Sequence, residues 1–298
     1  MISPAPLKEG DTIAIVSPAG ALRDAAVVER CRSVLESWGL NVYVAPHALA
    51  SNGYYSGTQE ERLNDFAQSL ADVNIKAILC SYGGYGCVHL LDGIAPLIAK
   101  QPKWIIGMSD CSALHAASLS QGVMSLHSPQ CRQLSESPDS IPAKTLKEIL
   151  FGARPTCTTA PHSLDIQGRA TGVLAGGNLS VLTALAGSRY DIFKEGTILF
   201  IEDTGEQPYR VERMMYQLEL SGALSKLKGI IVGEFNGVND DGRFGGTTYE
   251  LIHNIVSKYG IPVYFGFPVG HCNVNMPLIE GAEVELSVLN DKTILEYK

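Results

Sequence analysis

Three segments of the sequence carry side chains whose types and order could perform covalent catalysis. Ser109 follows a short apolar run and opens a helical pattern. Glu202 and Asp203 end another apolar run, and His271 lies in a loop rich in glycine and proline. A serine hydroxyl is a weak nucleophile and needs an adjacent base, and the imidazole in turn needs an acceptor that fixes its tautomer. A serine, a carboxylate and a histidine together would supply these three parts.

Each segment also has a simpler interpretation. The strand–helix junction at Ser109 would expose its Oγ and aim the next N–H at an oxyanion, but the G-x-S-x-G pattern is incomplete because Ser112 replaces its last glycine. Ser109 as a helix N-cap is the alternative. Neighbouring side chains on a strand point in opposite directions, so one of Glu202 and Asp203 can serve a site while the other caps the loop, or both are solvated. His271 is a base, a ligand or an exposed loop residue.

Other chemistry has weaker support. His115 and His127 flank the helix that follows the serine, but their spacing predicts no carboxylate partner. The histidines and cysteines lack metal-site spacing, so we expect no metal and no cofactor. The segment Gly83–Gly86 follows an apolar run but lacks the third glycine of the dinucleotide-binding pattern G-x-G-x-x-G. Its glycines Gly83 and Gly84 instead indicate that the backbone closely approaches a ligand and offers it an N–H donor. Residues 239–243 are typical of a turn and lack the spacing of an EF-hand loop.

The elements that must position these residues indicate an α/β fold. In the first half, short apolar runs alternate with helical patterns, which predicts a parallel sheet covered on both faces. Thr58 and Glu61 form a capping-box pair at the start of one helix. The strands expected in this half are 12–16, 41–45, 76–80, 104–107 and 123–127.

The second half repeats the mixture and ends in a hairpin pattern. Its expected strands are 170–174, 197–201, 229–232, 263–265, 284–289 and 293–297, and its expected helices are 179–186, 210–220 and 248–258. A segment rich in Pro, Thr and Ser separates the halves. We therefore expect a first domain at 1–152 with the serine, a linker at 153–167, and a second domain at 168–298 with the glutamate and the histidine.

Composition excludes several classes of protein. The chain has 298 residues, 45% of them apolar, with 23 Lys and Arg against 31 Asp and Glu, a formal net charge of −8. This acidity argues against nucleic-acid and membrane partners. The 7 cysteines are odd in number and form no C-x-x-C, which argues against a disulfide framework. With no signal-peptide pattern and no apolar run long enough to span a membrane, the sequence predicts a cytoplasmic protein.

The motifs, taken in order, resemble the LD-carboxypeptidase family, the serine peptidases that include the murein tetrapeptidases and the microcin C immunity peptidases. The resemblance extends over nearly the whole chain. No single motif is specific to the family, but their order along the chain is. The motifs lie at 16–20, 57–62, 83–86, 107–110, 127–129, 176–180, 199–203, 208–213 and 270–271.

The resemblance implies a role for each candidate. Ser109 would be the nucleophile, His271 the general base and Glu202 the acid that orients it, while the backbone N–H groups of Asp110 and Gly84 would hold the oxyanion. The family has an N-terminal α/β domain and a C-terminal β-rich α/β domain, with the triad divided between them. Its members are typically homodimers, so we expect a homodimer here.

The resemblance also implies a substrate, the murein tetrapeptide, from which D-Ala would be released during cell-wall recycling. Arg210 and Arg213 are our candidates for binding the terminal carboxylate, with surface ion pairs as the alternative. Tyr82 departs from the family, since many members carry arginine there. An immunity-type peptidase acting on a peptidyl-nucleotide amide is the second hypothesis. A non-catalytic small-molecule binding module is the third.

Overall fold

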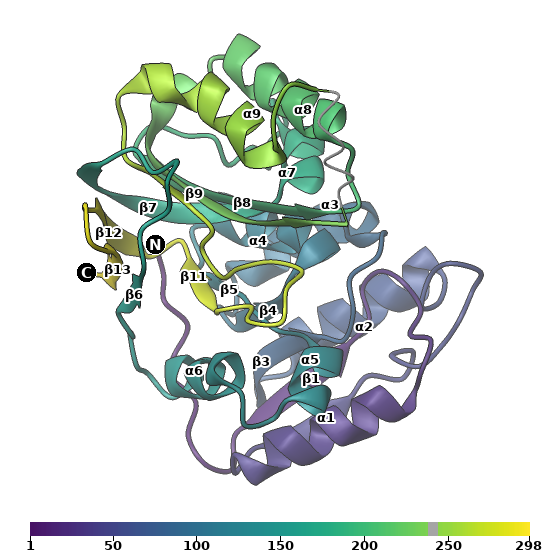
Figure 1. The fold of residues 1–298 in the computed structure, drawn as a ribbon. Coiled ribbons are helices and arrows are strands. Elements are labelled where there is room, and N and C mark those ends of the chain that lie inside the picture. Colours follow the sequence, from purple (N-terminus) through teal and green to yellow (C-terminus); the bar gives the residue numbers. More distant parts are fainter. Residues whose placement is uncertain (238–243) are drawn as a thin grey trace. The chain divides into compact units, whose positions relative to one another are not determined.

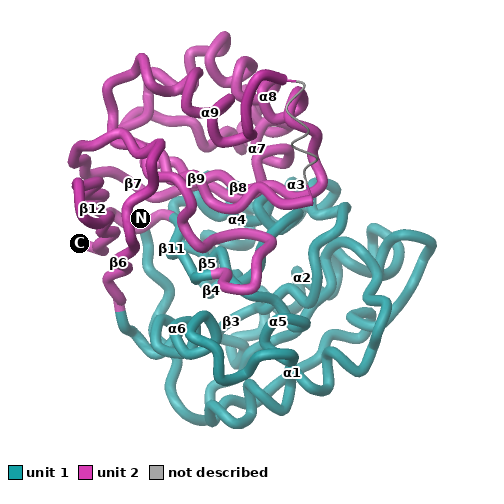
Figure 2. Tube along the Cα trace, in the orientation of Figure 1, with its two compact units in different colours: residues 1–153, 276–280 teal, residues 154–275, 281–298 magenta. Residues whose placement is uncertain are grey.

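The computed structural model describes residues 1–237 and 244–298, which divide into two compact units (Figure 2). Unit 1 comprises Met1–Ala153 and Met276–Glu280, and unit 2 comprises Arg154–Asn275 and Gly281–Lys298. Each unit has its own sheet with helices packed on it. The α/β class with two units is as expected from the sequence.

Unit 1 is built on a six-stranded sheet with the order β11-β5-β4-β3-β1-β2 (Figure 1). Strands β1 to β5 run parallel to their neighbours, and β11 pairs antiparallel with β5. The central strands β1, β3 and β4 are buried over nearly their whole length, which is typical of parallel strands covered on both faces. The strands are β1 Thr12–Val16, β2 Asn41–Val44, β3 Ile75–Cys80, β4 Trp104–Gly107, β5 Ser125–His127 and β11 Leu278–Glu280.

The helices of unit 1 fall into two contact groups, α1 with α5 and α2–α3–α4. The predicted capping box is confirmed, because Thr58 Oγ1 accepts from the Glu61 N–H at 3.2 Å and Glu61 Oε2 accepts from the Thr58 N–H at 2.8 Å. The helices are α1 Ala26–Ser37, α2 Gln59–Ala71, η1 Cys87–Leu90, α3 Leu91–Ile98, η2 Ser109–Cys111, α4 Ser112–Ser120, α5 Cys131–Glu136 and α6 Ile141–Leu150.

Unit 2 has a mixed seven-stranded sheet with the order β10-β9-β8-β7-β12-β13-β6. The strands from β10 to β7 are parallel, and those from β7 to β6 are antiparallel. The strands are β6 Cys157–Thr159, β7 Gly168–Asn178, β8 Thr197–Thr204, β9 Leu227–Asn236, β10 Val263–Phe265, β12 Glu283–Val288 and β13 Thr293–Tyr297.

The longer helices of unit 2 cover one face of this sheet (Figure 1). In the order of the chain, α7 packs against α8 and α8 packs against α9. The helices are α7 Leu179–Leu185, α8 Pro208–Leu220, η3 Leu224–Lys226, α9 Thr248–Val256 and η4 Ser257–Tyr259. Among the described residues, no helix is long and apolar enough to cross a membrane. The cysteines are free thiols.

The units differ in detail from the division drawn on the sequence. Residues 276–280 fall in the expected second domain, but the structure assigns them to unit 1 because β11 pairs with β5 there. The expected linker contains β6, which pairs with β13 as an edge strand of unit 2. Helices α5 and α6 were not predicted from the sequence. The predicted turn at 239–243 lies outside the described residues.

Candidate active site

Ser109 lies directly after β4 in a strained turn of unit 1. Its φ is 63°, which makes it the one non-glycine residue with a left-handed backbone in the described part of the chain. Such strain costs of order 1–3 kcal/mol and is typical of functional sites. The N-cap residues of η2 and α4 are Met108 and Cys111, so Ser109 occupies neither capping position. The turn has the form that presents a nucleophile at the carboxyl end of a parallel sheet.

Gly83 is the part of the glycine turn that approaches this serine. A Cβ at Gly83 would lie 2.8 Å from Ser109 Cβ, 3.0 Å from Ser109 Oγ and 3.4 Å from the Asp110 backbone nitrogen. Only a glycine fits at that distance. Gly84, the residue favoured from the sequence as an oxyanion donor, follows with a left-handed φ of 91°. The glycine turn and the serine turn of unit 1 are therefore in direct contact.

The Asp110 side chain ties these two turns together. It is 5% exposed, and its Oδ2 accepts a hydrogen bond of 2.7 Å from the Cys87 N–H, at the end of the glycine turn. Burial raises the pKa of this carboxyl to about 6. Sequence reasoning assigned Asp110 only a backbone role. The one hint in the sequence that the Asp110 side chain binds the glycine turn is its position, an acid directly after the candidate nucleophile.

His271 and Glu202 form a hydrogen-bonded pair in unit 2. Glu202 stands near the end of β8, where the pairing with β9 shifts register, and its side chain is fully buried. Its Oε2 lies 2.7 Å from His271 Nδ1, and the His271 side chain is 25% exposed. An ionised carboxylate can accept a hydrogen bond but cannot donate one, so Nδ1 carries the proton, and the neutral ring then has its lone pair at Nε2. This is the tautomer that a general base requires.

Backbone contacts hold this pair in place. Gly270 has a φ of 113°, and a Cβ there would lie 2.6 Å from Glu202 Oε2, so the chain passes directly over the carboxylate. The Gly270 N–H donates to Asn275 Oδ1 at 2.9 Å, and Asn236 Nδ2 donates to the carbonyl oxygen of His271. The glycine before the histidine was a signal for this close approach. Nothing in the sequence pointed to Asn236.

Asp203 points to different partners from its neighbour Glu202. Its two oxygens accept hydrogen bonds of 2.9 Å each from Asn178 Nδ2 and the Ser180 N–H, at the start of α7. The carboxyl is 2% exposed, and burial raises its pKa to about 6. Asp203 thus anchors a helix start, while Glu202 contacts the histidine.

The two arginines chosen from the sequence make surface contacts on α8. Arg210 lies 3.6 Å from Glu206 and its Nε donates to the Tyr209 hydroxyl at 3.2 Å. The Arg213 guanidinium lies 5.3 Å from the centre of the same tyrosine ring. The contact of Arg210 corresponds to the alternative of a surface ion pair, whereas Arg213 packs over an aromatic ring. The role of either arginine in binding a substrate remains a prediction.

His115, the other histidine considered as a base, is engaged inside unit 1. It is fully buried, its Nε2 donates to the Gly107 carbonyl at 3.0 Å, and its Nδ1 accepts from Ser125 Oγ at 2.9 Å. Burial lowers the pKa of this imidazole. With both ring nitrogens occupied, His115 supports the end of β4 and is a poor candidate for proton transfer.

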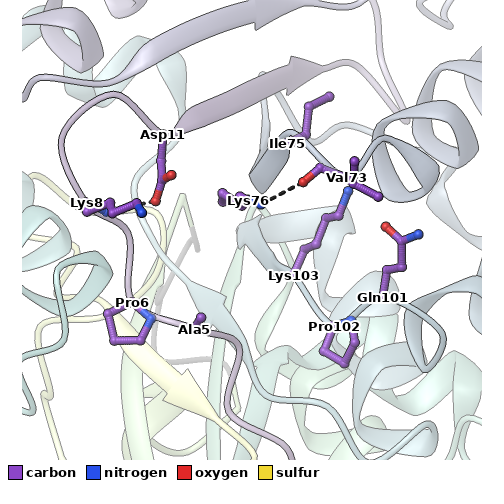
Figure 3. Close-up of a pocket in the computed structure, with 10 residues that line it drawn as sticks. All are labelled: Ala5, Pro6, Lys8, Asp11, Val73, Ile75, Lys76, Gln101, Pro102 and Lys103. Atoms are coloured by element: carbon purple, nitrogen blue, oxygen red, sulfur yellow. Dashed lines mark hydrogen bonds between the residues drawn. The ribbon is translucent and has the colours of Figure 1, made fainter.

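A separate cavity of about 480 Å³ opens at the opposite edge of the unit 1 sheet (Figure 3). It lies by the amino-terminal ends of the strands, near Asp11, Ile75 and Lys103, whereas Ser109 follows the carboxyl end of β4. Lys103 Nζ donates to the Ser69 carbonyl oxygen at 2.9 Å and also to that of Asp72. The cavity is therefore distinct from the serine turn. The described residues contain no cluster of side chains suited to a metal ion.

The strained serine and the carboxylate-bound histidine, each on its own α/β unit, are the parts from which serine hydrolases are built. Residues 13–128 match the LD-carboxypeptidase N-terminal domain and residues 171–286 match the LD-carboxypeptidase C-terminal domain. The chain belongs to the LD-carboxypeptidase family, as the resemblance of its motifs indicated.

The chain is similar to named proteins over most of its own length and most of theirs. The murein tetrapeptide carboxypeptidase of Pseudomonas aeruginosa is 32% identical over 277 residues, 87% of each chain. The structure is similar to that of a muramoyltetrapeptide carboxypeptidase from Oxalobacter formigenes, with a TM-score of 0.86, 29% identity, and coverage of 96% of this chain and 98% of the other. It is also similar to the microcin C7 self-immunity protein MccF, with a TM-score of 0.87, 26% identity, and coverage of 99% and 98%.

Proposed function

We propose that this protein is a serine carboxypeptidase that releases the C-terminal D-Ala from a murein tetrapeptide. The observation that carries the proposal is the left-handed φ of 63° at Ser109, at the position where the family motif has its nucleophile. The family membership supports it, as do the names of the two carboxypeptidase relatives.

In the proposed mechanism, Ser109 Oγ attacks the carbonyl carbon before D-Ala while His271 Nε2 takes the hydroxyl proton. Glu202 keeps the proton on Nδ1 and stabilises the imidazolium that forms. The N–H groups of Asp110 and Gly84 donate to the tetrahedral oxyanion. The C–N bond then breaks, D-Ala leaves as the amine with the proton from His271, and water hydrolyses the acyl-enzyme by the reverse roles.

The proposed chemistry needs no cofactor and no metal. A cation must still meet the terminal carboxylate of the substrate, and we propose Arg213 and Arg210 for it, since both are exposed on α8.

The protein would act in the cytoplasm as a homodimer, with a small peptide as its partner and neither nucleic acid nor membrane. Light scattering on the purified protein tests the homodimer.

The test is turnover of a murein tetrapeptide by the purified protein, with the tripeptide and D-Ala detected by mass. Ser109→Ala should abolish release of D-Ala. Ser120→Ala is the matched control, because Ser120 lies at the end of the same helix α4 and its Oγ donates only locally to the Ala117 carbonyl. Full turnover by Ser109→Ala would refute the proposal.

A peptidyl-nucleotide amide hydrolase is the second candidate. The observation in its favour is the fold similarity to MccF, whose complexes include one with glutamyl sulfamoyl guanosine at a TM-score of 0.87 and 26% identity. Supplying both substrates to the same preparation separates the two. Turnover of the nucleotide amide alone would favour the second candidate, and turnover of neither would favour a non-catalytic binding module.

A further inference from the structure

The two peptide carbonyls that precede Ser109 each accept a hydrogen bond from a buried side chain. The Gly107 carbonyl oxygen accepts from His115 Nε2 at 3.0 Å, and the Met108 carbonyl oxygen accepts from Gln130 Nε2 at 3.3 Å. His115 lies on α4 and is fully buried, and Gln130, directly before α5, is 7% exposed. We call these two side chains the backbone clamp.

Backbone N–H groups donate to the same two oxygens. The Ser128 nitrogen donates to the Gly107 oxygen at 3.0 Å, and the Cys111 nitrogen donates to the Met108 oxygen at 3.2 Å. A carbonyl oxygen has two lone pairs, so each of these oxygens has a donor for both. Because the peptide unit is planar, fixing the direction of the Met108 carbonyl also fixes the plane that carries the Ser109 nitrogen.

The strained backbone of Ser109 makes this fixing important. Its φ of 63° is left-handed, and strain of that kind disfavours a turn by a factor of about 5–150 relative to a relaxed one. Strained residues persist only where the surrounding structure over-determines them. The rotation that defines this φ starts from the peptide plane that the backbone clamp holds. Loss of either side-chain bond therefore allows the turn to relax.

Each side chain of the backbone clamp has a second buried partner. A carbonyl oxygen can only accept, so His115 Nε2 carries the proton toward Gly107, and Nδ1 lies 2.9 Å from Ser125 Oγ, whose hydroxyl can donate to it. The Gln130 Nε2 lies 3.4 Å from Cys111 Sγ as well. Both of these partners are fully buried. The second contacts restrict the rotation of the two donors and so keep them aimed at the carbonyls.

These contacts indicate a role in the reaction beyond support of the fold. We propose that His115 and Gln130 are positioning residues that hold Ser109 Oγ in its reactive place without contacting the substrate; this inference rests on the proposed function. A reacting group displaced by about 1 Å reacts about 10²-fold more slowly, so partial relaxation of the turn should cost about tenfold in kcat. Substrate binding would depend on other groups, so KM should stay within about twofold.

The test uses side chains of similar length that differ in the donor. His115→Met and Gln130→Met each remove the N–H that meets a carbonyl, whereas His115→Gln keeps an amide N–H at similar reach. Each methionine variant should lower kcat on murein tetrapeptide about tenfold and slow fluorophosphonate labelling of Ser109 by the same factor. His115→Gln should recover most of both losses.

Trp104→Phe is the matched control for lost stability. Trp104 lies at the start of β4 and is 1% exposed, and its Nε1 donates to the Ala5 carbonyl oxygen at 3.1 Å. Phenylalanine therefore removes a donor to a main-chain carbonyl from the same strand. It should lower the melting temperature while kcat and labelling stay within about twofold, because it acts at the other end of β4.

Two results would overturn the inference. One is a kcat and a labelling rate within about twofold of the wild type in both methionine variants. The other is a Trp104→Phe variant that loses as much activity as they do for the same loss of melting temperature.

A wild type that releases no D-Ala would refute the proposed function, and hydrogen exchange over residues 107–112, followed by mass spectrometry, then decides the role of the backbone clamp. Both methionine variants should exchange about tenfold faster than the wild type in this segment, and Trp104→Phe should not. Exchange at the wild-type rate in both methionine variants would overturn the inference on its own.

Discussion

The contact between Gly83 and Ser109 predicts a large catalytic effect from a single methyl group. Alanine at position 83 would place its Cβ 2.8 Å from Ser109 Cβ and 3.0 Å from Ser109 Oγ. Carbon atoms in ordinary contact are about 3.5–4.0 Å apart, so one side must move by about 0.7–1.2 Å. The φ of Gly83 lies outside the left-handed region, so alanine brings crowding without backbone strain.

A misplacement of about 1 Å at a reacting group costs about 10²-fold in rate. We therefore expect Gly83→Ala to lower kcat/KM on murein tetrapeptide about 10²-fold, which corresponds to about 2.7 kcal/mol of transition-state stabilisation. Steady-state kinetics with mass detection of the tripeptide gives this number. A thermal melt on the same sample shows whether the fold is retained.

Gly229→Ala is the matched control for crowding. Its Cβ would meet Leu286 Cδ2 at 3.1 Å inside the sheet of unit 2, again without a left-handed φ. It should lower the melting temperature and leave kcat/KM within about twofold, because it does not touch the serine turn. A Gly83→Ala variant with wild-type kcat/KM would refute the reasoning that this glycine sets the position of the nucleophile.

The other predictions concern the two neighbouring acids of β8. Glu202→Gln should lower kcat about 10³–10⁴-fold, because an amide no longer holds the proton on His271 Nδ1; an unchanged kcat would show that the pair has no catalytic role. The pKa of Asp203 is raised from 3.8 to about 6, so its ionisation in the folded state destabilises the protein progressively as pH rises from about 4 to above 6. In urea unfolding, the stability of the wild type relative to Asp203→Asn should therefore be about 2 kcal/mol lower at pH 7.5 than at pH 4, and an equal difference at both pH values would contradict this.

The local parts of the site could be predicted from the sequence. The apolar run before Ser109 and the helix after it predict a strand–turn–helix, and that is what β4, η2 and α4 form. Period-2 alternation implied that Glu202 and Asp203 point to different partners, and their hydrogen bonds do differ. These features depend on neighbouring residues, which is why local patterns reveal them.

Long-range contacts could not be predicted from local patterns. The sequence indicated that the glycine turn makes a close backbone approach, but nothing in a run of glycines shows which of them packs against a distant turn. In the structure Gly83 contacts Ser109, and the role of Gly84 as an oxyanion donor stays a prediction. The short strand β11 joins the sheet of unit 1 from far along the chain, through pairing that only the fold defines. Asn236 holds the His271 carbonyl from another strand end, and an isolated asparagine carries no signal of that role.

Covalent labelling with a fluorophosphonate, mapped by peptide mass, tests the central claim most directly. Such probes react with a serine only where a base and oxyanion donors activate it. The account predicts one adduct per chain, on Ser109, blocked by murein tetrapeptide and absent in Ser109→Ala. An adduct on another serine, or none on Ser109 in a preparation that releases D-Ala, would contradict it.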